Sequence, residues 1–506
     1  MKRYFLLVAL AIVFLFVYTV TLAQYISLSF LLELLPHNIF IYFLVGLVWL
    51  LALIIAISIV LKQSYAYKKS HWLIVILLNP ILGVLLYLIF ARDFISRKFP
   101  KTRPLIANKA FLGLEETTQV DYEKRDYGNI FRFIHDTTGR AVYQDDTHVE
   151  ILNNGDVFFP RLLDELGKAS KYIFMEFYII KTDKIGRRVL DVLKEKAEAG
   201  VDVYLIYDHF GSNRYLNNKY MRELKRSGVN IGIFDPQTIS VFNSNLNFRN
   251  HRKAIVIDGL IGFIGGMNLG DEYNHESKKF GFWRDTHILA LGNGVTSIQN
   301  VFVKDWYYIT KKVLDYPMDK TNADYRGLVS FIESGPDYEN GLIRDVYLKM
   351  FHDAKKSIKI VTPYLIIEPE MMAAIKITAK SGLDIKLLVP GKSDYALVGL
   401  ATRSYYEELL KIGVKIYEYA DHFVHSKILI IDDAVASVGS VNFDPRSFHL
   451  SFEVTSVFYN KAVQKLVRSF NQDLEVSNEI NLDEWQKRGI LKRFIQGLLN
   501  LFSPIF

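Results

Sequence analysis

The residues best suited to chemistry are two histidines, each followed two positions later by a lysine. His251 and Lys253 open the segment HRKAIVID, and His425 and Lys427 open the segment HSKILIID. Each pair begins an apolar run typical of a buried strand, in which residues i and i+2 share one face. An imidazole can attack as a nucleophile or transfer a proton near neutral pH, and a neighbouring ammonium can bind an anion. The chain has no cysteine, which excludes a thiol nucleophile, a disulfide and a thiolate zinc site.

The two segments belong to longer stretches that match at a constant offset of 174 residues. Over 251–268 and 425–442 six positions are identical, and five of them are polar or glycine. These pairs are His251/His425, Lys253/Lys427, Ile257/Ile431, Asp258/Asp432, Gly265/Gly439 and Asn268/Asn442. A duplicated core usually keeps its apolar positions, so the shared polar residues indicate that both copies serve one chemistry.

Strands and helices alternate in the same order before each segment. In the first half, the predicted strands are 171–180, 201–208 and a run from 229, with helices at 187–200 and 220–228. In the second half, the predicted strands are 357–367, 383–390 and 414–419, with helices at 369–382 and 404–413. This order predicts parallel βαβ units in two copies, and hence an α/β fold made by internal duplication.

Three uncharged apolar runs stand at the front of the chain, at residues 4–32, 39–61 and 72–91. Each is long enough for a hydrocarbon core of about 30 Å, so we expect N-terminal transmembrane helices. The third run holds an Asn-Pro pair at its middle, so it either spans the membrane or re-enters it. The first run, with its triplet TLA, would also fit a cleaved secretory signal, but it continues past that triplet, which favours a retained anchor.

The basic residues around these runs predict an orientation. Lys2 and Arg3 precede the first run, and three lysines follow the second, so the positive-inside rule places both ends of this hairpin in the cytoplasm. We therefore expect a multi-pass protein of the cell membrane with a cytoplasmic catalytic domain. The net charge of +7 favours attraction to anionic lipid. Nucleic acid is not an expected partner, because no long Lys/Arg run follows residue 110.

Two HxKxxxxD motifs in one chain resemble the phospholipase D superfamily. The segments LLVPGKSD, VGSVNFDPRSFHLSFE, GGMNLGDEY and WRDTH, and the front end HWLIVILLNPILGVLLYLIFARDF, resemble the bacterial cardiolipin synthases within it. The resemblance implies two phospholipase D-like lobes whose motifs meet in one active site, with no metal and no cofactor. The expected divisions are a membrane region 1–91, a basic linker 92–125, a first lobe 126–325 and a second lobe 326–506.

The resemblance also implies opposite roles for the two histidines. One attacks phosphorus to give a phosphatidyl-histidine, while the other protonates the leaving glycerol oxygen and then deprotonates the incoming hydroxyl. We expect His251 to be the nucleophile, because the first-motif histidine often takes that role in this superfamily, although the sequence itself treats both alike. The expected catalytic set is His251, Lys253, Asp258, His425, Lys427 and Asp432, in which the aspartates fix the turn after each strand.

Further positions are expected around these motifs. The lysine of each motif and two asparagines would hold the non-bridging phosphate oxygens. By resemblance, Asp285 would orient His251, and Glu453 would orient His425. The positions expected to bind substrate or to orient the histidines are Asn268, Asn442, Ser440, Asp285 and Glu453.

The expected function is a membrane-bound phosphatidyltransferase that makes cardiolipin and glycerol from two phosphatidylglycerol molecules. A phosphatidylserine synthase or a hydrolysing phospholipase D would share the motif pair, and an inactive lipid-binding scaffold is the alternative from another class. At the end of the chain, residues 491–502 predict an amphipathic helix that either lies on the membrane or packs against the second lobe. Its apolar face comprises Leu491, Phe494, Ile495, Leu498, Leu499 and Phe502.

Overall fold

The computed structural model describes residues 39–61, 66–90, 120–234, 248–276, 281–316, 324–338, 341–420 and 422–501. The chain divides into two compact units, Met1–Lys98 and Phe99–Phe506. The expected span at 4–32 and most of the expected linker at 92–125 lie outside the described residues.

The described part of the first unit consists of α2 (Ile39–Leu61), α3 (Ala66–Leu78) and α4 (Pro80–Phe90). The predicted run 72–91 is thus broken at Asn79, whose side chain accepts a hydrogen bond from the Leu82 N–H at 3.0 Å and caps α4. A Cβ on Gly83 would lie 2.6 Å from the Cα of Ile76, so α3 and α4 pack closely. Among the residues that the structure describes, no helix is both long and apolar enough to cross a membrane.

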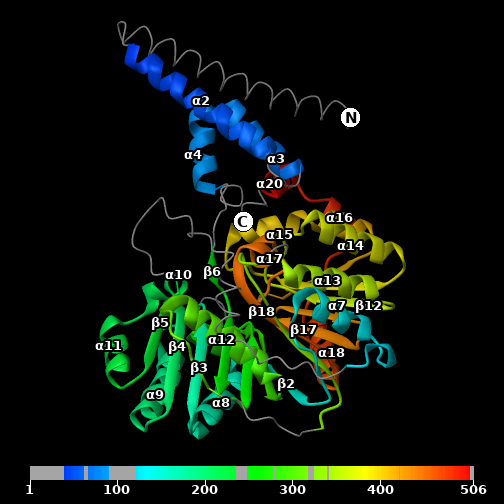
Figure 1. Ribbon diagram of the computed structural model, residues 1–506. Coiled ribbons are helices and arrows are strands. Elements are labelled where there is room, and N and C mark those ends of the chain that lie inside the picture. Colours follow the sequence, from blue (N-terminus) through cyan, green and yellow to red (C-terminus); the bar gives the residue numbers. More distant parts are fainter. Residues whose placement is uncertain are drawn as a thin grey trace. The chain divides into compact units, whose positions relative to one another are not determined.

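The second unit is built on two mixed sheets with the same strand order (Figure 1). The first runs β2 (Thr147–Asn153), β10 (Thr286–Gly292), β8 (Ile261–Gly265), β7 (Lys253–Ile257), β3 (Tyr172–Phe177), β4 (Asp202–Asp208) and β5 (Asn230–Phe234). The second contains, in the equivalent order, β11 (Gly327–Ser334), β18 (Ser451–Asn460), β17 (Val435–Gly439), β16 (Ile428–Ile431), β12 (Ser357–Val361), β13 (Asp384–Pro390) and β14 (Lys415–Tyr419), and β19 (Asn478–Glu479) pairs with the edge of β14. The predicted duplication is therefore confirmed.

Each sheet combines a parallel and an antiparallel part. Strands β3, β4 and β5 pair in parallel, as do β12, β13 and β14, which are the predicted βαβ units. The motif strands β7 and β16 run antiparallel to β3 and β12. The predicted helices are observed as α9 (Lys184–Glu198), α11 (Asn218–Arg226), α14 (Pro369–Lys380) and α16 (Tyr406–Lys411).

The other helices of this unit cover the sheets or join the lobes. They include α8 (Gly155–Lys168), α12 (Val295–Thr310), α13 (Leu342–Asp353) and α18 (Ala462–Glu475). Helix α7 (Gly128–Thr138) packs in the second lobe's core, and β1 (Tyr143–Gln144) pairs with β11. Helix α7 and strand β1 therefore complete the second lobe, and the lobes are not separated at a single position of the sequence.

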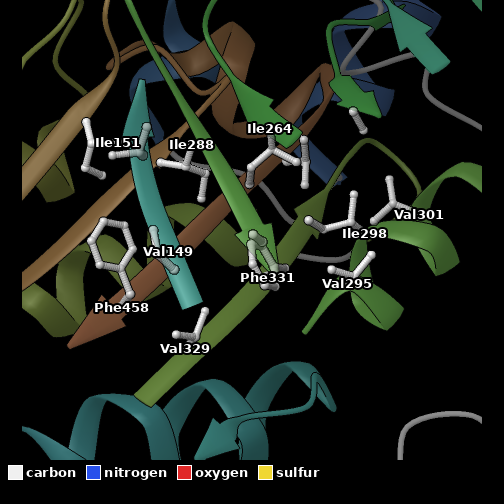
Figure 2. Close-up of a cluster of buried hydrophobic side chains, with 14 of the residues drawn as sticks. Val149, Ile151, Ile264, Ile288, Val295, Ile298, Val301, Val329, Phe331 and Phe458 are labelled. Atoms are coloured by element: carbon white, nitrogen blue, oxygen red, sulfur yellow. The ribbon is translucent and has the colours of Figure 1, made fainter. Parts of the chain in front are cut away.

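The two lobes share one buried core, shown in Figure 2. Val149 and Ile288 come from the first sheet, whereas Val329, Phe331 and Phe458 come from the second, and all five are buried. Strand β8 contacts β17 and β18 across this core. Because the apolar surface of each sheet is removed from water by the other, the lobes form one body.

Candidate active site

Two short parallel strand pairs tie each motif to the opposite lobe. Strand β6 (Arg249–Asn250) pairs with the start of β18, and β15 (Phe423–Val424) pairs with β9 (Trp283–Arg284). The next residue after β6 and β15 is a motif histidine in both cases. The His251 N–H donates to the Phe452 carbonyl at 2.9 Å, and the His425 N–H donates to the Arg284 carbonyl at 2.7 Å.

This register decides which carboxylate meets which imidazole. The residue after each accepting carbonyl is acidic, so Glu453 lies against His251 and Asp285 against His425. His251 Nδ1 is 3.0 Å from both Glu453 oxygens, and His425 Nδ1 is 2.7 Å from Asp285 Oδ2. The expected pairing, Asp285 with His251 and Glu453 with His425, was wrong, because each carboxylate serves the histidine of the other lobe.

The two motif lysines are buried beside the histidines. Lys253 Nζ donates to the His251 carbonyl at 2.6 Å, while Lys427 Nζ donates to the His425 carbonyl and lies 2.9 Å from its Nδ1. Burial lowers the pKa of Lys253 well below its ordinary value and that of Lys427 to about 8, although nearby carboxylates oppose the effect. Burial makes the positive charge of both ammonium groups costly, and a bound anion would stabilise that charge. The two lysines are therefore suited to an anionic ligand.

The two asparagines line the same cavity but differ in their partners. Asn268 donates to the Tyr273 hydroxyl at 2.6 Å and accepts from the Ile179 N–H at 3.1 Å. Asn442 is buried, yet its Oδ1 has no hydrogen-bond partner among the described residues. A buried carbonyl without a partner is rare, and it leaves Asn442 free to bind a hydroxyl of a ligand.

Ser440, which was expected to contact substrate, instead supports the carboxylate. Its Oγ donates to Glu453 and accepts from the Val454 N–H at 3.0 Å. The equivalent position in the first lobe is Gly266, where a Cβ would collide with the Asp285 carboxylate. The second lobe thus holds the Glu453 carboxylate with the Ser440 hydroxyl, whereas the first lobe has a glycine that leaves room for the Asp285 carboxylate.

Asp258 and Asp432 lie at the far ends of the motif strands, away from the histidines. Asp258 accepts from the N–H groups of Ser170, Lys171 and Tyr172 at 2.8–2.9 Å. Asp432 accepts in the same way from the N–H groups of residues 355–357. Both have a φ of +53°, so they hold turns, and neither lines the cavity that contains the histidines.

Arg252, between the histidine and lysine of the first motif, was missed by the sequence reasoning. Its side chain is 1% exposed, forms an ion pair with Asp305 of α12, and donates from Nε to the Glu453 carbonyl at 3.2 Å. Arg252 therefore holds the backbone at Glu453, whose carboxylate contacts His251. The second copy has Ser426 at this position, so the repeat comparison gave no signal for it.

A cavity of about 680 Å³ opens over both histidines. Its lining contains His251, His425, Asn268 and Asn442. It also contains the aromatic residues Tyr178, Phe210, Tyr215, Tyr273, Trp283, Tyr364 and Tyr395 and the charged residues Lys181, Arg214, Arg249, Glu272, Asp394, Asp444 and Arg446. The sequence reasoning missed the aromatic and charged group. Several of these aromatic and charged residues follow the carboxyl ends of parallel strands, where ligands of open α/β sheets bind. Their position in the sequence could therefore have indicated them.

The two histidine–carboxylate pairs differ in charge. Burial and the charges of Lys253 and Lys427 lower the pKa of His251 well below its ordinary value. Burial lowers the pKa of His425 to about 3, against the effect of Asp285. Burial opposes ionisation of Asp285, yet His425 and Lys427 hold its pKa at about 2, whereas burial raises the pKa of Glu453 to about 8. The more stable negative charge therefore lies beside His425.

Duplicated sheets whose HxK strands meet over one cavity define the phospholipase D-like class of enzymes. Residues 162–281 and 347–474 match the family described as "Cardiolipin synthase, PLD-like domain", and residues 47–92 match "Phospholipase_D-nuclease N-terminal". Cardiolipin synthase 2 of Bacillus anthracis is 39% identical over 465 residues, and that of Bacillus cereus is 40% identical; both alignments cover 90% of each chain. The chain belongs to the bacterial cardiolipin synthase family.

A solved structure supports the fold. The phosphatidylserine synthase of Haemophilus influenzae Rd KW20 superposes with a TM-score of 0.55 at 15% sequence identity. The match covers 71% of this chain and 95% of that chain. At this identity the likeness concerns the fold alone.

Proposed function

We propose that this protein transfers the phosphatidyl group of one phosphatidylglycerol to a second, giving cardiolipin and glycerol. Its relatives along about nine tenths of the chain are cardiolipin synthases, so the activity is that of a phosphatidyltransferase. The observation that carries the mechanism is that both motif histidines line one cavity, each hydrogen-bonded by the carboxylate of the opposite lobe.

His251 is the proposed nucleophile. Glu453 holds its Nδ1, which leaves Nε2 to attack phosphorus. The P–N bond forms as the bond from phosphorus to the headgroup glycerol oxygen breaks, and His425 gives that oxygen a proton. Lys253 and Lys427 stabilise the charge that gathers on the non-bridging oxygens.

The second step reverses the roles of acid and base. His425 takes a proton from a headgroup hydroxyl of the second phosphatidylglycerol, and this oxygen attacks phosphorus. The P–N bond to His251 breaks, and cardiolipin is released. Water in place of the lipid hydroxyl would give phosphatidic acid, so the cavity has to favour the lipid acceptor.

The unequal charges of the two pairs support this assignment. A base that takes a proton becomes an imidazolium, which a stable carboxylate beside it favours. Asp285, with its pKa of about 2, provides that carboxylate for His425. Burial raises the pKa of Glu453 to about 8, so Glu453 provides a less stable negative charge beside His251. An imidazolium at His425 is therefore better stabilised than one at His251, which suits His425 to the role of base.

A location at the cytoplasmic face of the cell membrane completes the proposal. It is supported by the charge-free apolar runs of the sequence and the basic residues that flank them, and by the match of residues 47–92 to "Phospholipase_D-nuclease N-terminal". A multi-pass anchor would keep the catalytic unit beside its lipid substrate.

The test is a transfer assay on the purified full chain in detergent, with phosphatidylglycerol labelled in its headgroup and phosphate. Cardiolipin and free glycerol are expected, and both should disappear in His251→Ala and His425→Ala but persist in His352→Ala, a histidine of α13 outside the cavity. Phosphatidic acid as the main product would indicate a hydrolase. The absence of any product from the intact chain would favour a scaffold.

A further inference from the structure

The C-terminal helix α20 (Ile490–Leu501) attaches to the second lobe through polar side chains. Gln496 is 2% exposed and accepts from Arg488 Nε at 2.9 Å, while Asn500 donates to Ser404 Oγ at 3.0 Å. Ser404 ends α15 (Ala396–Ser404), the helix that packs against α20. Arg488 also pairs with Glu407 at 2.9 Å. The specific contacts that hold α20 on the protein are therefore polar.

Most of the apolar residues of α20 point to the outside. Ile490, Leu491, Phe494, Ile495 and Leu498 are between 38% and 71% exposed, whereas Leu499 is half-buried. A helix on the surface of a water-soluble domain shows the opposite arrangement, with its apolar stripe on the core. The sequence left open whether this helix packs on the lobe or lies on a membrane. It does pack on the lobe, but with its apolar stripe left uncovered.

Helix α15 connects α20 with the rim of the active-site cavity. Tyr395 and Val398, at the start of α15, line that cavity, and Leu397 between them is 58% exposed. Phe210 also lines the cavity and is 60% exposed. Since α15 packs on α20, these side chains extend the apolar surface from the helix to the cavity.

Basic residues accompany the apolar stripe. Lys487, Lys492 and Arg493 are exposed on or just before α20. Apolar side chains beside lysine and arginine match the boundary between acyl chains and anionic headgroups. A water-soluble partner protein would match the apolar stripe but would not explain why it leads to a cavity that takes phospholipid.

We infer that the surface formed by Ile490, Leu491, Phe494, Ile495 and Leu498 docks into the interface of an anionic phospholipid bilayer, and that it holds the cavity rim against the lipid. The nature of the lipid, phosphatidylglycerol, rests on the proposed function. The docking itself rests on the inverted helix, its basic residues and its continuity with the cavity.

The chain has no cysteine, so one introduced thiol gives a unique labelling site for a direct test. Phe494→Cys in the full chain would carry an environment-sensitive fluorophore, with the protein reconstituted in phosphatidylglycerol vesicles containing nitroxide-labelled acyl chains. Val157→Cys is the matched control, because Val157 is 45% exposed and α8 lies at the other end of this unit (Figure 1). Quenching at residue 494 should exceed that at residue 157 several-fold, and it should weaken in phosphatidylcholine vesicles.

Two outcomes of this experiment would overturn the inference. A label at 494 that reports water, as at 157, would mean that the helix stays in solution. A label shielded from water but not quenched by lipid nitroxide would mean that protein covers the stripe, either a second copy or the first unit of the same chain.

A kinetic experiment separates docking from the reaction. Leu491→Asp with Phe494→Asp should lower cardiolipin formation several-fold on phosphatidylglycerol vesicles, yet leave it unchanged on phosphatidylglycerol dispersed in detergent micelles. Val157→Asp should affect neither. If the double variant and the unaltered chain reacted at equal rates on vesicles, the docking inference would be refuted and the proposed function would stand. If the unaltered chain made no cardiolipin in either medium, the proposed function would be refuted.

Discussion

His251 and Glu453 lie 202 residues apart in the sequence, yet the imidazole Nδ1 is 3.0 Å from both carboxylate oxygens. The contact crosses the lobe boundary, and His425 makes the reciprocal contact with Asp285. Neither lobe alone therefore holds an oriented histidine. The duplication supplies two incomplete halves, and docking of the lobes completes both pairs at once.

Glu453→Gln is expected to slow attack on phosphorus by about 100-fold or more, because an amide cannot stabilise positive charge on His251 and can reverse its tautomer. The measurement is rapid-quench formation of phosphohistidine from a phosphatidyl ester with a nitrophenol leaving group. This leaving group needs no proton from an acid, so only the nucleophile is tested.

Asp285→Asn is the matched control for that experiment. It should retain rapid phosphohistidine formation with the nitrophenyl ester but lose turnover with phosphatidylglycerol, whose glycerol oxygen requires a proton from His425. The opposite result, with Asp285→Asn slow and Glu453→Gln fast on the nitrophenyl ester, would make His425 the nucleophile.

Much of the fold could be predicted from the sequence, because periodicity and the internal repeat are local signals. The strand–helix order of β3 to β5 and of β12 to β14 followed from apolar runs and glycine stops. The predicted strand 357–367 ends at Val361, shortly before Pro363, because proline cannot donate to the ladder. The lobe-crossing carboxylates could not be predicted, since they depend on the two-residue strands β6 and β15, which have no pattern of their own.

The same limit applies to α20. Its amphipathic spacing was evident from the sequence, but spacing alone does not say which face meets the protein. That depends on the hydrogen bonds of Gln496 with Arg488 and of Asn500 with Ser404.

Asp258→Asn is expected to destabilise the second unit by about 1–3 kcal/mol, because the carboxylate accepts three backbone N–H groups. Those bonds lower its pKa against the effect of burial, so the stabilisation is present above the unfolded pKa and is lost as the pH falls through the folded pKa. Urea unfolding at neutral and acidic pH measures this change. Asp164→Asn, an exposed acid of α8, should change stability by less than about 0.5 kcal/mol. Loss of turnover by folded Asp258→Asn would show that the residue does more than hold the turn.

Asn442→Ala is expected to lower kcat/KM by about 10- to 100-fold with little loss of stability, because its Oδ1 has no protein partner among the described residues. Asn268→Ala should instead lower the Tm as well, since Asn268 holds Tyr273 and the backbone of Ile179. Parallel kinetics and thermal unfolding compare the two variants. Equal losses of stability would mean that Asn442 is a packing residue.

The pH dependence of kcat/KM is expected to show a basic limb near pH 8. Burial lowers the pKa of Lys427 to about 8 in the free enzyme, so raising the pH through this value removes a positive charge that attracts the phosphate. Lys427→Arg keeps its charge, so the limb should move to higher pH even though the overall rate falls. Rates from pH 6 to pH 10 on phosphatidylglycerol in neutral detergent measure the limb. A limb that remains near pH 8 in Lys427→Arg would show that the charge of Lys427 does not set it.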